Sequence, residues 1–158
     1  MNTNILDTDL WKNTAIILGI VVSTYSVSLS GLEYSRQGTL KRADYFFELG
    51  KRFKQDNNLM EICSLCEVDD PALKIKPYNK RASLLSFFEE IAISMDSKLI
   101  KKEVVHYMFG YYIIKCWESE NFWFDLDRDG FYWTLFSRFA KEMKENETKK
   151  NKYTKLRL

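Results

Sequence analysis

Proline and glycine are scarce in this chain of 158 residues, which has two prolines and six glycines. Both residues interrupt helices, and apolar residues make up 46% of the chain, so the composition favours helices around a packed core. No β-rich run with hairpin turns occurs in the sequence. We therefore expect an all-α protein.

Cysteine and histidine are also scarce, with three cysteines and one histidine. An odd number of cysteines without a disulfide-scaffold pattern fits a reducing compartment. Cys63, Cys66, Cys116 and His106 could in principle ligate zinc. His106 and Cys116 are ten residues apart on one expected helix, however, or about 15 Å along its axis. We expect small buried thiols instead, and nothing in the sequence implies a cofactor.

Charge is missing from one long stretch near the N-terminus. No charged residue lies between Lys12 and Glu33, which leaves 20 residues, about the length of one bilayer crossing. Nine of them are Ile, Leu or Val, which contribute about −3 to −5 kcal/mol to insertion. Part of this is offset by the hydroxyls of Ser23, Thr24, Ser26, Ser28 and Ser30. Two alternatives fit less well. The segment lacks the basic leader and the cleavage site of a signal peptide, and a buried core helix is usually shorter than this stretch. We predict a leader over 1–12 and a transmembrane helix over 13–32.

The basic residues beside this segment predict its orientation. The net charge of the chain is +2, but residues 33–54 carry six basic and three acidic residues, against Lys12 alone on the other side. The positive-inside rule then places the N-terminus outside and residues 33–158 in the cytoplasm, at a bacterial inner membrane. Arg36, Lys41 and Arg42 lie nearest to the span, so we expect them to contact the bilayer surface and its anionic headgroups.

Small residues form a stripe along the expected membrane helix. Gly19, Ser23, Ser26 and Ser30 follow one another at spacings of four, three and four residues. Such stripes let helices approach closely in lipid, so a self-association face that makes a homo-oligomer is one interpretation. An ordinary serine-rich span is the other.

The cytoplasmic domain is expected over 33–145 as one helical bundle. Apolar residues recur at helical spacing in five segments: 33–56, about 58–67, 80–96, 98–118 and 131–145. The first of these could continue the membrane helix, with Gly38 as a break. The core should hold large rings, namely Phe87, Phe88, Trp117, Phe122, Trp123 and Trp133. The lysine-rich tail over 146–158 is expected to be disordered, and with Tyr153 as its sole aromatic it does not indicate a nucleic-acid partner.

An acidic motif precedes the last expected helix. Asp125, Asp127, Asp129 and the following glycine match the first six positions of a calcium loop, but position 12 falls on Phe136. Cation binding by the three aspartates is one interpretation, and a turn in which Asp127 or Asp129 caps the last helix is the other. Glu89 and Glu90 adjoin the apolar face of the expected helix over 80–96, so at least one of them should face solvent. Solvated charges with a pair to Arg81 are one interpretation, and a paired-carboxylate active site is the other.

Four strings in the chain resemble a known group of proteins. They are RADYFFEL at 42–49, FFEEIAI at 87–93, FGYY at 109–112, and the pattern of Trp133, Leu135, Phe136 and Phe139. The chain is similar in these strings, and in its layout, to uncharacterised small bacterial membrane proteins of the domain-of-unknown-function type. That resemblance implies one N-terminal span and a helical cytoplasmic domain, and it implies no activity.

Three functional hypotheses follow. The first is a membrane-anchored cytoplasmic binding or regulatory module without catalysis, which contacts a protein or small ligand through aromatic surface. The second is an oligomeric effector of a prokaryotic defence or toxin system, in which assembled spans breach the membrane. The third is a metal-dependent enzyme using Asp125, Asp127 and Glu89, for which no complete motif exists.

Overall fold

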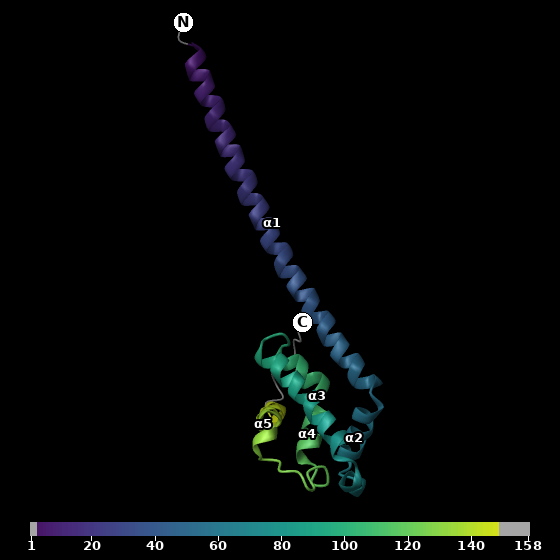
Figure 1. The fold of residues 1–158 in the computed structure, drawn as a ribbon. Helices are drawn as coiled ribbons and strands as arrows, with labels where there is room; N and C mark the ends of the chain where they lie inside the picture. The colour runs from purple at the N-terminus through teal and green to yellow at the C-terminus, as the bar shows by residue number, and fades with distance from the viewer. Residues whose placement is uncertain (1–2, 149–158) are drawn as a thin grey trace. The chain divides into compact units, whose positions relative to one another are not determined.

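The computed structural model describes residues 3–148, and all the regular secondary structure in this range is helical. Five α-helices and two short 3₁₀-helices occur in it, and no strand (Figure 1). The all-α prediction is therefore confirmed. Most of the predicted tail, residues 149–158, lies outside the described residues.

The first helix is much longer than any of the predicted segments. Helix α1 (Thr3–Gln55) has 53 residues, so it takes in most of the leader, the uncharged segment and the first segment of the bundle. Gly38 does not break it, since one glycine costs a helix only about 1 kcal/mol. By length and composition, α1 is the one described helix that could cross a membrane.

The next helix begins after a one-residue interruption. Asp56 lies outside the helical conformation, and its carboxylate accepts the backbone N–H groups of Asn58 and Leu59 at 2.9 and 3.1 Å. It thereby caps α2 (Asn57–Glu67). The helix therefore breaks at Asp56, one residue before the predicted break near residue 57.

The second half of the chain follows the predicted order with shifted boundaries. The elements after α2 are η1 (Pro71–Ile75), α3 (Tyr78–Asp96), α4 (Lys102–Glu118), η2 (Phe131–Trp133) and α5 (Thr134–Thr148). The prediction that α4 begins near residue 98 is wrong, because Ser97 ends α3 and Lys98 turns the chain with a φ of 60°. Helix α5 also runs three residues into the predicted tail.

The chain divides into two compact units, the first ending at Lys41 and the second beginning at Arg42. The first unit contains most of α1. In the second, α4 packs against α2 and α5, and α3 packs against the same two helices (Figure 1). The C-terminal part of α1 joins this bundle through Phe53, whose ring stacks on Phe87 at 5.4 Å and meets Phe109 edge-on at 5.5 Å.

Large rings fill the core of the second unit, as predicted. Phe88 and Phe122 are fully buried, and Phe87 and Trp123 are nearly so. The other two predicted rings, Trp117 and Trp133, are partly buried and pack against this core. Each fully buried ring stabilises the fold by about 1.5–3 kcal/mol relative to exposure, so the rings are a substantial part of the stability of the bundle.

Candidate functional site

Asp125, the first residue of the acidic motif, is engaged by a buried arginine. The guanidinium of Arg81 is 1% exposed and donates to Asp125 Oδ1 at 2.7 Å. It also donates to the carbonyl oxygens of Phe122 and Phe124 at 2.8 and 2.7 Å. The interpretation that Arg81 pairs with Glu89 or Glu90 is therefore wrong, and Arg81 instead connects α3 to the segment before α5.

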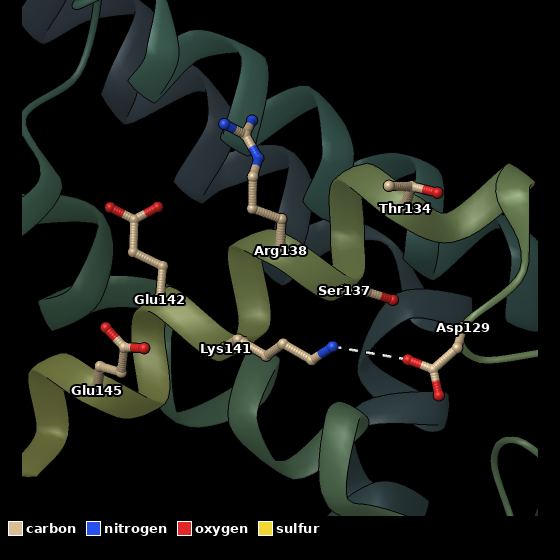
Figure 2. Close-up of a pocket in the computed structure, with 7 residues that line it drawn as sticks. All are labelled: Asp129, Thr134, Ser137, Arg138, Lys141, Glu142 and Glu145. Carbon is tan, nitrogen blue, oxygen red and sulfur yellow. Dashed lines mark ion pairs between the residues drawn. The ribbon is translucent and has the colours of Figure 1, made fainter.

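The other two aspartates of the motif serve a turn and a surface ion pair. The backbone carbonyl of Asp127 accepts the N–H of Gly130 at 3.1 Å. The carboxylate of Asp129 lies 3.6 Å from Lys141 Nζ, as Figure 2 shows. Among residues 3–148, no three His, Cys, Asp or Glu side chains gather as metal ligands would.

A shallow groove of about 510 Å³ runs along α5 beside Asp129. Its seven lining residues are drawn in Figure 2: Asp129, Thr134, Ser137, Arg138, Lys141, Glu142 and Glu145. Ion pairs join its lining residues to each other and to neighbouring helices, since Arg138 pairs with Asp96 and Glu142 with Lys102. The groove is therefore a solvated, ion-paired surface.

The two adjacent glutamates of α3 have separate structural roles. Glu90 pairs with Arg52 of α1. Glu89 is half-buried, and its carboxylate accepts the backbone N–H of Phe136 at 3.3 Å, in the first turn of α5. Burial raises the pKa of Glu89, and the Phe136 N–H partly opposes that rise. The predicted cap of α5 by Asp127 or Asp129 is thus wrong, because the capping carboxylate comes from another helix.

The three cysteines lie together in the core as free thiols. Cys63 and Cys66 of α2 and Cys116 of α4 are all at most 2% exposed. Burial raises the pKa of both Cys63 and Cys116 well above the usual range. Such thiols stay protonated and behave as small apolar side chains, as the sequence indicated.

The small-residue stripe of α1 is exposed along its whole length. A Cβ added at Gly19 would meet nothing within 4 Å, and Ser23, Ser26 and Ser30 are exposed. Two of these hydroxyls donate back to carbonyls four residues earlier, Ser23 to Gly19 at 2.7 Å and Ser30 to Ser26 at 2.9 Å. Thr24 and Ser28 do the same. These four hydroxyls therefore need no other acceptor.

The three basic residues predicted to contact a bilayer surface are exposed on α1. Arg36 and Lys41 belong to the first unit, and Arg42 begins the second. Arg42 also lines a groove of about 550 Å³ at the start of α4.

Three exposed aromatic side chains were missed by the sequence analysis. Phe131 and Tyr132 form η2 and are 89% and 85% exposed, with their rings edge-to-face at 6.0 Å. Phe124, on the same connection between α4 and α5, is 52% exposed and lies under the ammonium of Lys74 at 5.2 Å. The helical periodicity that begins at residue 131 predicted Phe131 and Tyr132 to be part of the last helix. No local pattern indicated that both rings are exposed.

No known protein family, curated protein or solved structure matches this chain. The resemblance to uncharacterised small bacterial membrane proteins stays a prediction.

Proposed function

We propose that this chain is a single-pass membrane protein whose α1 anchors a helical bundle with a binding or regulatory role. The main observation behind this proposal is that no side chain from Trp11 to Gly31 is buried within the chain. One helix cannot cover its own apolar side chains, and lipid accommodates them where water does not. Eight aliphatic side chains are 48–73% exposed: Ile16, Ile17, Leu18, Ile20, Val21, Val22, Val27 and Leu29.

The back-bonded hydroxyls of α1 support the same proposal. A hydroxyl without a partner is costly in hydrocarbon. Ser23, Thr24, Ser28 and Ser30 each donate to a carbonyl of their own helix at 2.7–2.9 Å. This reduces the penalty that their polarity imposes on a span of modest hydrophobicity.

The orientation in this proposal has the N-terminus outside and the bundle in the cytoplasm of a bacterial inner membrane. It rests on the basic residues Arg36, Lys41 and Arg42 following the uncharged segment. Their exposure leaves them accessible to anionic headgroups. The free, buried thiols suit a reducing compartment.

The bundle is proposed to bind a protein partner through the exposed pair Phe131 and Tyr132. Exposed aromatic pairs are costly to leave in water and are enriched at interfaces. The carboxylates that could suggest catalysis have structural partners instead. Asp125 accepts a hydrogen bond from Arg81, and Glu89 accepts the backbone N–H of Phe136 in α5.

A photo-crosslinking amino acid at Tyr132, used in native membranes, tests this partner surface. We expect a discrete adduct at Tyr132 and none at Tyr107, a control of similar exposure on α4. The adduct mass separates a second copy of the chain from another protein. Equal labelling at both positions, or none at either, would remove the partner from the proposal.

A second candidate is the oligomeric effector, which the open stripe of α1 favours. Gly19 and Ser23 leave space for a neighbouring helix, since nothing lies within 4 Å of a Cβ at Gly19. Dye leakage from cells expressing the chain should then vanish in the double variant Gly19→Leu and Ser23→Leu. Leakage equal to that of the unchanged chain would eliminate this candidate.

A further inference from the structure

The connection between α3 and α4 is a firmly held loop that displays basic and apolar side chains. Ile100 is 4% exposed and anchors the loop in the core. The N–H groups of Leu99 and Ile100 both donate to the carbonyl of Ser94, at 2.9 and 3.2 Å. Lys98 and Lys101 are nevertheless exposed, and Leu99 between them is 46% exposed.

A groove of about 550 Å³ joins this loop to the beginning of the second unit. Its lining includes four basic residues: Arg42, Lys98, Lys101 and Lys102. The carboxylates that line it are Asp96, Glu103 and Glu142. Asp96 already pairs with Arg138 from outside the lining, and Glu142 pairs with Lys102 at 2.6 Å. Four cationic groups and three carboxylates line the groove, so its lining has an excess of one positive charge, and two of the three carboxylates are already paired.

Chain connectivity limits how far this groove can lie from the proposed membrane span. Arg42 follows Leu32, the last residue of the uncharged segment, by ten residues. Ten residues reach at most about 36 Å even when fully extended. Arg42 therefore lies within about 36 Å of the end of the proposed span for any arrangement of the two units.

We propose that the Ser97–Lys102 loop and Arg42 form a docking surface for anionic phospholipid headgroups. This inference rests on the proposed membrane anchoring. The lysines complement phosphate charge, and Leu99 supplies an apolar side chain for the interfacial region of the bilayer. The surface adds to the contact expected of Arg36 and Lys41, and it would set the bundle's orientation on the membrane.

The test uses the full chain with Leu99→Cys, labelled with an environment-sensitive fluorophore. The native thiols are at most 2% exposed, so the new exposed thiol reacts selectively. The labelled chain is reconstituted into vesicles of phosphatidylcholine, with or without phosphatidylglycerol. We expect a blue-shifted emission only with phosphatidylglycerol, and its loss at high salt. The control carries the same label at Ile75→Cys, an exposed position on another connection, where no shift is expected.

A triple variant separates charge from simple apolar contact. Lys98→Gln, Lys101→Gln and Lys102→Gln, combined with the label at residue 99, should abolish the shift while the far-UV circular dichroism is unchanged. No lipid-dependent shift at residue 99, an equal shift at residue 75, or a shift that survives the triple variant would each overturn the proposal. An equal shift with inorganic phosphate alone would also overturn it, in favour of a phosphate site.

Alkaline-carbonate extraction of the same vesicles reports on anchoring independently. A chain that stays in the vesicle pellet but shows no shift disproves the docking surface alone. A chain that is released disproves the proposed anchoring as well.

Discussion

At the scale of single residues, the chain places charged groups where they organise connections. Arg81 is the clearest case, because a buried guanidinium needs partners and finds three acceptors in residues 122–125. Those acceptors lie more than 40 residues away, and two are backbone carbonyls. No sequence pattern specifies such a partner, which is why the sequence offered only the nearby glutamates Glu89 and Glu90 as partners for Arg81.

Replacing Arg81 tests this role directly. Arg81→Met keeps the length of the side chain but leaves the carbonyls of Phe122 and Phe124 without their donor. We expect a loss of about 3 kcal/mol in the free energy of unfolding. The measurement is chemical denaturation of the detergent-solubilised chain, followed by near-UV circular dichroism.

Arg138→Met is the matched control for that measurement. Arg138 pairs with Asp96 on the surface, where both side chains are well exposed, so its loss should cost no more than about 1 kcal/mol. Similar losses in the two variants would mean that the contacts of Arg81 contribute little.

Asp69 makes stability depend on pH. The Ser119 hydroxyl, at 2.6 Å, and next the backbone N–H of Asn121, at 2.9 Å, lower the pKa of its carboxyl despite partial burial. A carboxyl whose folded pKa lies below its unfolded value stabilises the fold at higher pH. That contribution is complete above about pH 5, falls as pH drops through the unfolded pKa of about 3.9, and is lost below the folded pKa.

The variant Asp69→Asn should therefore be destabilised at pH 7 by about 1–2 kcal/mol, and by less at pH 3. Thermal unfolding of both proteins across this range measures the difference. A gap between the proteins that stays constant with pH would show that ionisation of Asp69 is irrelevant.

At the scale of elements, apolar periodicity predicted the helices and local chemistry predicted only some of their ends. The segments over 80–96 and 131–145 match α3 and α5 to within a few residues. The end of α5 that Glu89 caps could not be predicted, because the carboxylate lies 47 residues before the N–H it accepts. Asp56 is different, since an aspartate before a helix is a local signal that the sequence does contain.

The Glu89 cap is testable with two substitutions. Glu89→Ala removes the acceptor of the Phe136 N–H and should cost about 1 kcal/mol of stability at pH 7. Glu89→Gln keeps an acceptor oxygen and removes a half-buried charge, so it should cost less than half as much. Thermal unfolding at pH 7 compares them, and a glutamine variant as unstable as the alanine variant would contradict the capping role.

Two glycines of α1 give opposite expectations for the same substitution. A Cβ at Gly38 meets nothing within 4 Å, so Gly38→Ala should stabilise α1 by up to about 1 kcal/mol. A Cβ at Gly50 would come within 2.7 Å of Met108 Cε, so Gly50→Ala must displace that side chain. This substitution should therefore increase the stability of the protein less than Gly38→Ala does, or decrease it. Helicity and thermal unfolding measure both, and equal gains would mean that the Met108 contact is unimportant.

At the scale of the whole molecule, a net charge of +2 conceals a strong division along the chain. The uncharged segment, the basic residues after it and the stripe from Gly19 to Ser30 were all recognisable in sequence, because each depends on neighbours within one helix. The exposed pair of Phe131 and Tyr132 was not, because exposure depends on the packing of the whole bundle. The groove beside Lys98 likewise needs three segments brought together by folding.

Membrane extraction tests the central claim most directly. Membranes from cells expressing the full chain are washed with alkaline carbonate, alongside the double variant Ile17→Lys and Val21→Lys. The matched control, Val68→Lys and Ile75→Lys, adds the same charges at exposed apolar positions of the bundle. Membrane anchoring by α1 predicts that the unchanged chain and the control stay in the membrane pellet and that the first variant is released. Release of the unchanged chain, or retention of all three proteins alike, would contradict it.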